Sequence, residues 1–392
     1  MNESLQVILP ALIALAATVW IHPYVLKVAK EKNIVDNPDW RKLQRTPVPI
    51  WGGLTVVFGI FAGMMAFSIL GEFRGLFPAF AAMVIIWVVG AIDDIISLSP
   101  KVRFVVEILL ILCLSYATGH QLNNFHGLWG LWAIPNYVSI PLTVFACVGI
   151  INAINLIDGV DGYSSGYSIV SCILFGSMFY ALGNLQMVAF TAIVAASLMP
   201  FFFYNVFGKE SKMFIGDAGT LSLGVIFSVF ITTILSSQPE GTSFAPNIGL
   251  VPFTLAVLCI PVFDTLRVMS ARMVRGKSPF NPDKTHLHHL FIELGYSHIG
   301  TALSIIGINL FVVLCWYLAY RHGWSIDAQL YLVVALGVLM TFVFYFFTKV
   351  QIRKETKIYR GLRVLAALTH AERKGFWFTL QKLADRSTDK EI

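Results

Sequence analysis

Acidic and amide side chains occur in three short segments of this chain, and a group of histidines occurs in a fourth. The segments are GAIDDIISLSP with Asp93 and Asp94, NAINLIDGVDG with Asn155, Asp158 and Asp161, FIGDAG with Asp217, and PDKTHLHHL with His286, His288 and His289. Carboxylates inside or beside an apolar span are costly and usually functional. One of them alone would be explained as a solvated helix end, but four segments that reach one level of a bilayer predict a common site.

Oxygen-rich side chains of this kind favour a hard divalent cation. Mg²⁺ in proteins is usually bound by one or two carboxylates together with the phosphates of a substrate. Arg45, Lys101 and Arg103 lie in neighbouring polar segments, and an Arg can bind phosphate oxygens in a bidentate manner. The combination predicts phosphoryl transfer, in which catalysis is mostly positioning and charge neutralisation. A site among apolar segments further predicts that one reactant is a lipid.

The elements that position these segments are expected to be membrane-spanning helices. Of the 392 residues, 57% are hydrophobic and 13% are charged, about half the charged fraction of a soluble domain. A membrane helix needs about 20 mostly apolar residues, and eleven stretches qualify: 4–26, 50–70, 76–95, 104–119, 138–156, 163–183, 185–206, 218–236, 249–267, 299–320 and 328–348. We therefore expect an all-α polytopic membrane protein, and neither a soluble enzyme, a disordered chain nor a nucleic-acid-binding protein.

Basic residues determine the expected orientation. Of the 28 Lys and Arg residues, only Arg74 and Arg321 fall on the side opposite the acidic segments. Because loops rich in Lys and Arg stay in the cytoplasm, we expect the N-terminus outside and the C-terminus and active site at the cytoplasmic face. Residues 1–348 are expected to form the membrane domain. Residues 349–392 are expected to form a basic tail, as an amphipathic helix on the membrane surface.

The motifs NAINLIDGVDG, GDAGTLSLG and PDKTHLHHL, with RKLQRTPVPIWGG at 41–53, resemble those of the polyprenyl-phosphate N-acetylhexosamine-1-phosphate transferases, in their WecA-like branch of undecaprenyl-phosphate GlcNAc-1-phosphate transferases. The resemblance covers all eleven expected spans. It implies transfer of a sugar 1-phosphate from a UDP-N-acetylhexosamine to undecaprenyl phosphate, with release of UMP. It also implies Mg²⁺ as cofactor, with Mn²⁺ as the alternative cation. The implied location is the inner membrane of a bacterium, where the assembly of surface polysaccharides begins. A homodimer is left open.

The resemblance assigns roles to individual residues of the site. Asp217 matches the Mg²⁺-binding aspartate, and Asn155 matches a residue that helps to hold the metal and the pyrophosphate, with Asp158 close by. Asp161 takes the position that reads the edge of the uracil ring, where an oxygen can accept a hydrogen bond from the ring N–H. Phe214 takes the position that stacks on the uracil.

Asp93 and Asp94 match the acidic pair beside the lipid phosphate. A phosphate monoester is already mostly deprotonated near neutral pH, so it hardly needs a base. The pair is expected to aid the attacking phosphate in a direct displacement at the β-phosphorus, with a covalent aspartyl intermediate as the alternative. We place His286 and Asp158 with this pair in the expected catalytic set.

Cations and histidines complete the expected substrate contacts. Arg45 matches a basic residue directed at the nucleotide, and Arg103 matches a cation near the pyrophosphate. His286, His288 and His289 match an HxHH motif that the branch associates with the sugar nucleotide. The resemblance thus implies that these five side chains bind the UDP-sugar.

Two positions depart from the family pattern, Ser97 after the acidic pair and Gln44 after the Arg-Lys pair. They leave the sugar open: UDP-GlcNAc is the leading donor, and UDP-GalNAc, a deoxy-N-acetylhexosamine or UDP-MurNAc-pentapeptide is the alternative. Asp264 is expected only to pair with Arg267 on the same helix face.

A membrane transporter is the alternative from another functional class, because intramembrane acids also mark ion pathways. A transporter predicts polar residues near the middle of several spans. Only Glu107 occupies such a position, so the sequence favours chemistry at one membrane face.

Overall fold

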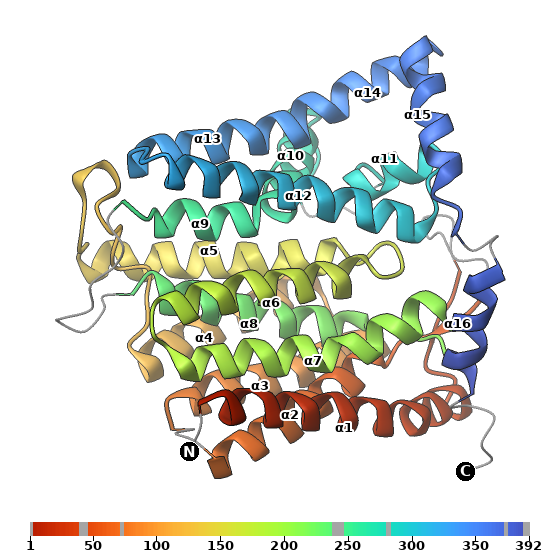
Figure 1. Cartoon of the computed structure of the whole chain (residues 1–392), viewed down its shortest axis with the longest axis horizontal. Coiled ribbons are helices and arrows are strands. Elements are labelled where there is room, and N and C mark those ends of the chain that lie inside the picture. The colour runs from red at the N-terminus through yellow and green to blue at the C-terminus, as the bar shows by residue number, and fades with distance from the viewer. Residues whose placement is uncertain are drawn as a thin grey trace.

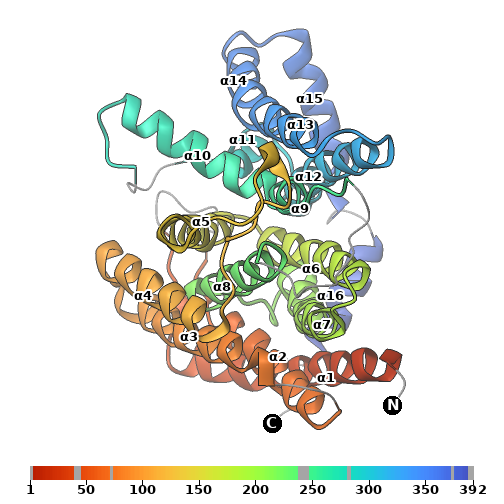
Figure 2. The same cartoon turned by 90° about the vertical axis from the view of Figure 1, so that its left-hand side faces the viewer.

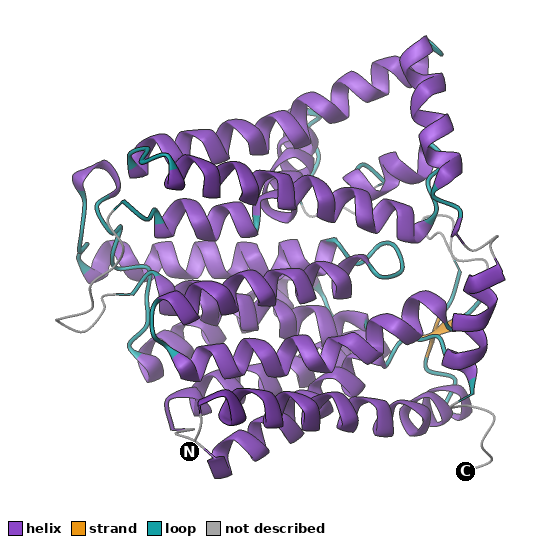
Figure 3. Cartoon of the chain, in the orientation of Figure 1, coloured by secondary structure: helices purple, strands orange, loops and turns teal. Residues whose placement is uncertain are grey.

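Helices make up most of the computed structural model, which describes residues 3–38, 46–70, 74–236, 247–279, 284–371 and 375–386 (Figures 1 and 3). The helices are α1 (Glu3–Glu31), α2 (Gly52–Leu70), α3 (Phe77–Ile96), α4 (Pro100–Thr118), α5 (Asn136–Leu156), α6 (Tyr163–Ala181), α7 (Leu185–Phe207), α8 (Gly216–Ile234), α9 (Leu250–Val257), α10 (Cys259–Val274), α11 (Leu287–Glu293), α12 (His298–Arg321), α13 (Ile326–Val338), α14 (Phe344–Arg353), α15 (Lys357–Leu368) and α16 (Gly375–Asp385). Short 3₁₀ turns lie at Arg74–Leu76 and Leu128–Gly130, and a π-helical segment at Leu339–Val343 joins α13 to α14.

The long helices lie side by side along one common direction (Figure 1). In the described part of the chain, eight helical units are long and apolar enough to cross a membrane: α1, α2, α3, α5, α7, α8, α12 and the continuous unit from α13 to α14. The bent pair α9–α10 makes nine if it counts as one span. This agrees with a polytopic all-α membrane protein. The other two expected stretches form α4 and α6, which lie in the same bundle but are more polar. Lys101, Arg103 and Glu107 lie in α4, and Ser and Tyr residues fill the first turns of α6.

Helix α8 is the centre of the bundle, packed against α2, α3, α5 and α6 (Figure 2). Every residue of α8 from Ala218 to Ile234 is buried. Small residues allow the neighbouring helices to come close: a Cβ atom on Gly90 of α3 would lie 2.5 Å from the Cα atom of Ala218. Gly53 of α2 and Gly219 of α8 face each other in a similar backbone contact. These contacts determine where the first turn of α8, which carries Asp217, lies relative to the end of α3.

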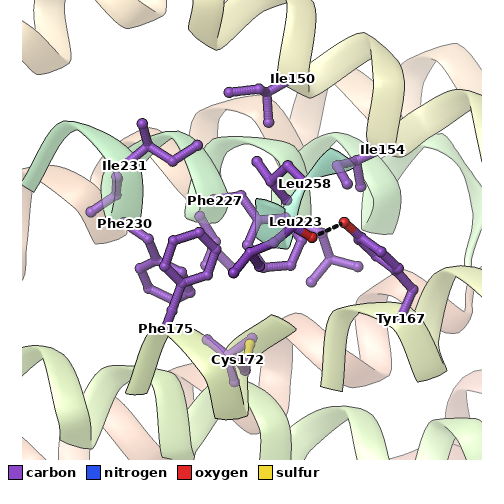
Figure 4. Packing of buried hydrophobic residues seen from close by; sticks show 14 of the residues in the cluster. Ile150, Ile154, Tyr167, Cys172, Phe175, Leu223, Phe227, Phe230, Ile231 and Leu258 are labelled. Atoms are coloured by element: carbon purple, nitrogen blue, oxygen red, sulfur yellow. Dashed lines mark hydrogen bonds between the residues drawn. The ribbon is translucent and has the colours of Figure 1, made fainter. Parts of the chain in front are cut away.

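An aromatic cluster fills the space between α6 and α8 (Figure 4). The ring of Phe175 lies 5.4 Å from that of Phe230 and 6.2 Å from that of Phe227, measured between centroids. All three side chains are fully buried. Because helices in a bilayer associate through van der Waals packing rather than through removal of apolar surface from water, the contact of these three rings holds α6 against α8.

The chain bends by 72° between α9 and α10, so the stretch expected as one span at 249–267 is not a straight helix. Pro261 has no N–H to donate to the Val257 carbonyl four residues earlier. The Tyr167 hydroxyl donates to this carbonyl instead, at 2.6 Å (Figure 4). The Asn309 amide nitrogen also donates to it, at 3.0 Å. The bend is therefore supported by hydrogen bonds from α6 and α12, as non-helical backbone among membrane helices requires.

The remaining elements gather at one end of the bundle. The antiparallel strands β1 (Val35–Asp36) and β2 (Val48–Pro49) lie at this end (Figure 3). The tail expected as one amphipathic helix forms two helices, α15 and α16, and both lie across this end (Figure 1). The expected boundary after residue 348 falls inside α14, which continues to Arg353.

Candidate active site

A cavity of about 1020 Å³ opens at the end of the bundle where β1, β2 and α16 lie. Ten of the side chains expected in the site line it: Asp93, Asp94, Asn155, Asp158, Asp161, Phe214, Asp217, His286, His288 and His289. Arg103 lies directly behind this lining and contacts two of the acids. Arg45 lies outside the described residues. The folded chain thus brings the three acidic and amide segments and the histidine segment to one open cavity.

The two acids at the end of α3 have different partners. Asp94 accepts hydrogen bonds from the backbone N–H groups of Asp217 at 2.8 Å and of Ala218 at 3.2 Å. A carboxylate is favourable there because the N–H groups of a first helical turn have no partner within the helix. Asp93 instead accepts from the backbone N–H of Leu98 at 2.6 Å and from Arg103 at 3.0 Å. Asp94 therefore joins α3 to the start of α8, and Asp93 joins it to α4.

Arg103 is a shared cation behind the cavity. Its guanidinium lies 3.0 Å from Asp93, 3.7 Å from Glu107 and 3.9 Å from Asp217. Glu107 is fully buried and accepts a further hydrogen bond from the Asn152 amide at 2.6 Å. The one acid near the middle of a span is thus paired within the bundle, as buried charges must be. This arrangement favours a structural role for Glu107 over an ion pathway.

Asp217 is oriented by the side chain of Asn155. The Asn155 amide nitrogen donates to Asp217 Oδ1 at 2.5 Å and to the Thr220 hydroxyl at 2.8 Å. The amide oxygen of Asn155 is then the atom left to face the cavity. A carboxylate oxygen and an amide oxygen are both suitable ligands for Mg²⁺.

The charge of the cavity fits a divalent cation. Among the described residues, Asp94 and Asp158 have no Lys, Arg or His within 4.0 Å, so they form no ion pair; Asp158 accepts only from the Ser164 hydroxyl, at 2.6 Å. The described residues contain no group of three His, Cys, Asp or Glu that could hold a metal without a substrate. Mg²⁺ characteristically keeps such an incomplete protein shell and completes it with phosphate oxygens and water. Asp217 and Asn155 fit that pattern.

Asp161 is held by two bases that the sequence reasoning did not include. Lys212 lies 2.6 Å from Asp161 Oδ2 and His298 lies 2.8 Å from it. Burial alone would raise the pKa of Asp161, but the hydrogen bond and charge of His298, together with Lys212, outweigh it and hold the pKa below its ordinary value. The Lys212 ammonium also lies 5.6 Å from the centre of the Phe214 ring. The position of Lys212 two residues before Phe214 was the signal available in the sequence.

The backbone around Phe214 is held by the end of β2 and the first residue of α2. Its N–H donates to the Pro49 carbonyl at 2.8 Å, and its carbonyl accepts from the N–H of Gly52 at 2.9 Å. Phe214 and Asp161 thus both lie against Lys212, and all three side chains line the cavity.

The histidine segment is anchored by Asp264. The pairing of Asp264 with Arg267 is confirmed, at 2.6 Å, but the same carboxylate also contacts His286 Nδ1 at 2.9 Å and the backbone N–H of Leu287 at 3.2 Å. The rings of His286 and His288 are parallel with centroids 5.8 Å apart, and those of His288 and His289 are 4.2 Å apart. The role of Asp264 in holding His286 was missed because it joins residues 22 positions apart.

His288 predicts a loss of stability in acid. Burial, with the neighbouring His289 and His286 adding to it, lowers the pKa of His288 well below its ordinary value of 6.5. Below pH 6.5 the unfolded chain binds a proton at His288 and the folded chain does not. The free energy of unfolding therefore decreases as the pH is lowered, by up to about 1.4 kcal/mol per pH unit. We expect the thermal midpoint to fall from pH 7.5 to 5.5, and to fall less in His288→Gln. Parallel curves for the two proteins, from scanning fluorimetry in detergent, would contradict this.

Comparison with known proteins places the site in a family context. The sequence pattern of glycosyl transferase family 4 matches residues 76–235, which contain Asp93, Asp94, Asn155 and Asp217. A protein of Bacillus subtilis (strain 168), named a probable undecaprenyl-phosphate N-acetylglucosaminyl 1-phosphate transferase, is 31% identical over 78% of this chain and 82% of its own length. Proteins of Yersinia pestis and Escherichia coli (strain K12), each named an undecaprenyl-phosphate alpha-N-acetylglucosaminyl 1-phosphate transferase, are 32% and 29% identical over 69% and 70% of this chain and 73% of their own lengths.

Proposed function

Since this chain belongs to glycosyl transferase family 4, the family of these undecaprenyl-phosphate sugar-1-phosphate transferases, we propose that it transfers GlcNAc 1-phosphate from UDP-GlcNAc to undecaprenyl phosphate and releases UMP. One observation carries the proposal. The acidic pair at the end of α3, the Asn155–Asp217 pair and the Asp161–Lys212–Phe214 group all line or border one cavity. Such an arrangement offers places for an attacking phosphate, a metal-bound pyrophosphate and a nucleobase.

In this proposal Asp217 and Asn155 hold Mg²⁺, with Mn²⁺ as a substitute, and Asp158 adds a negative charge to the lining of the same cavity. Bound there, the cation would neutralise charge on the pyrophosphate. Asp217 is held for this role by Asn155, and Arg103 adds a second positive charge 3.9 Å from its carboxylate. This side-chain set supports positioning as the main catalytic device, as is usual in phosphoryl transfer.

The donor occupies the half of the cavity that Asp161, Phe214 and the histidines line. Asp161 accepts from the uracil N–H while Lys212 holds the carboxylate ionised, and Phe214 stacks on the ring. His286, His288 and His289 contact the sugar and its phosphate, with His286 fixed by Asp264. Arg45 joins them by the family resemblance.

The acceptor phosphate lies beside Asp93 and Asp94. One of its oxygens attacks the β-phosphorus of the UDP-sugar; the bond from that phosphorus to the bridging oxygen breaks, and UMP leaves with both bonding electrons. Each carboxylate is already engaged, Asp94 by two backbone N–H groups and Asp93 by Leu98 and Arg103. Hydrogen bonds to a carboxylate withdraw electron density from its oxygens and make each acid a weaker nucleophile, which supports a direct displacement over a covalent aspartyl intermediate.

The proposal includes the placement of the protein in a bacterial inner membrane. Eleven spans, with α4 and α6 among them, put the cavity and the C-terminus on the cytoplasmic side and the N-terminus outside. The distribution of Lys and Arg supports this orientation. The exposed apolar side chains Val364, Leu365 and Leu368 of α15 and Phe376 and Phe378 of α16 support a tail that lies on the membrane surface. A homodimer stays an expectation of the family resemblance.

The test is transfer of radiolabelled sugar phosphate by the purified protein in detergent, with undecaprenyl phosphate as acceptor. Parallel reactions contain UDP-GlcNAc, UDP-GalNAc or UDP-MurNAc-pentapeptide, each with Mg²⁺, Mn²⁺ or EDTA. We expect lipid-linked product from UDP-GlcNAc that depends on the cation. Product from a different donor would keep the reaction and change the sugar, whereas folded protein that binds UMP but yields no product from any donor would refute the proposal.

A further inference from the structure

The segment from residue 208 to 213, which joins α7 to α8, is the loop that carries Lys212 and leads to Phe214. Its carbonyl groups are bound from the body of the protein. The Glu210 carbonyl accepts from the Lys30 ammonium at 2.9 Å, and the Ser211 carbonyl lies 2.8 Å from Nε2 of the buried His22. The Met213 carbonyl accepts from the Asn205 amide at 2.9 Å. Helices α1 and α7 therefore hold one side of this loop.

The N–H groups of the same loop are bound by the C-terminal helix α16. Asp385 Oδ1 accepts from the backbone N–H groups of Lys209, Glu210 and Ser211 at 3.1, 3.1 and 3.0 Å, and from the Ser211 hydroxyl at 2.8 Å. Three successive N–H groups that converge on one oxygen form an anion-binding nest. The carboxylate that fills the nest is 174 residues away from Ser211 in the sequence.

A second contact places α16 beside the cavity. The ring of Trp377 lies 4.7 Å from that of Phe207 at the end of α7, and Trp377 and Gln381 both line the cavity. In Figure 1, α16 lies beside the ends of α1 and α7, at the end of the bundle that holds the cavity. The helix thus contacts the loop at Asp385 and borders the cavity one to two turns earlier.

We propose that α16 is a positioning element for the donor half of the cavity, in which Asp385 fixes the 208–213 loop and thereby the position of Lys212 and Phe214. This inference rests on the proposed function and adds a specific role for the tail. Charge-assisted hydrogen bonds are about twice as strong as neutral ones, and here four donors share one carboxylate. Without it, three adjacent N–H groups lose their partner and the loop is held from its carbonyl side only.

The position of the loop matters because it contains Lys212 and leads directly into Phe214, and both side chains line the proposed nucleotide site. Lys212 pairs with Asp161 at 2.6 Å, and Phe214 follows two residues later on the same backbone. A shift of the loop displaces both the charge that holds Asp161 ionised and the ring that stacks on the uracil. The acids beside the acceptor phosphate, Asp93 and Asp94, are held by α4 and α8 instead, so they are not displaced.

The experiment compares Asp385→Ala with Asp385→Glu in the full-length protein. Loss of the charged hydrogen bonds is expected to raise KM for UDP-GlcNAc about tenfold in Asp385→Ala, while kcat and the KM for undecaprenyl phosphate stay within about twofold. Asp385→Glu keeps the carboxylate and should recover most of the donor affinity. Amide hydrogen exchange of Lys209–Ser211 should be faster in Asp385→Ala and near wild type in Asp385→Glu.

Lys382→Ala is the matched control, since Lys382 is an exposed residue of the same helix and its replacement should change neither KM nor exchange. Wild-type KM in Asp385→Ala, or an equal rise of both KM values, would overturn the inference. A wild-type protein without transferase activity would instead refute the proposed function. In that case binding of UMP by calorimetry decides the role of α16: weaker binding in Asp385→Ala supports it, and unchanged binding overturns it.

Discussion

Asp217→Asn is expected to reduce the transfer of sugar phosphate on the order of 100- to 1000-fold, the cost of removing one key electrostatic group from an active site. The substitution keeps the shape of the side chain but removes its negative charge. In the wild-type protein the Asn155 amide nitrogen donates to Asp217 Oδ1 at 2.5 Å, and the substitution places a second amide group at that position. We expect higher Mg²⁺ concentrations to restore little of the rate, as measured by the initial rate of lipid-linked product formation over a Mg²⁺ titration.

The matched control is Asp327→Asn, the same change at the opposite end of the bundle. Asp327 accepts from the backbone N–H of Trp129 at 2.7 Å. It lies in the first turn of α13, and α13 begins at the end of the bundle opposite to α16 (Figure 1). Asp327→Asn should leave the rate of transfer within about twofold of wild type. The exposed hydrogen bond that it weakens contributes about 1 kcal/mol to stability and does not position any residue of the cavity. A rate in Asp217→Asn close to that of the control would remove Asp217 from the proposed metal site.

Gly90→Val is expected to separate α3 from α8 and to lower activity by more than tenfold. A Cβ atom at this position would lie 2.5 Å from Ala218 Cα and 2.6 Å from Ala218 N, so the two helices must move apart. The movement stretches the hydrogen bonds that the N–H groups of Asp217 and Ala218 donate to Asp94. Overpacking of this kind also costs about 1–3 kcal/mol of stability, which would appear as a lower thermal midpoint.

Gly149→Val is the control for this substitution. Gly149 lies in the middle of α5, and a Cβ atom there would meet no atom within 4 Å. The two variants share the same change in side chain and in helix propensity, and differ only in the close approach to α8. Equal activity of the two would show that the distance between α3 and α8 does not control the site.

Much of the candidate site was predictable because its residues lie in short motifs. Asp93, Asp94, Asn155, Asp161 and Asp217 were all expected at one level, and the cavity contains them all. Each motif lies at the end or the start of a helix, so the apolar stretches that define the helices also bring the motifs together.

The remaining residues could not be predicted because they depend on contacts between distant parts of the chain. Lys212 and His298 meet at Asp161 across 51 and 137 residues, and Asp385 reaches the loop after α7 from the C-terminal helix. A Lys or an Asp in a polar segment has no periodicity that would distinguish it from a solvated surface residue. The fold shows the same division: Pro261 was a visible signal for the bend, but the partners of the freed Val257 carbonyl come from α6 and α12.

The bend at Pro261 has a practical consequence for exchanging parts between relatives. Its hydrogen bonds come from Tyr167 and Asn309, both inside the bundle, so the direction of α10 does not depend on a bound ligand. The stretch between Arg267 and His286 is tied back at both ends by the single carboxylate of Asp264. A graft of that stretch from a relative would therefore start and end at residues that the recipient's own Asp264 already holds.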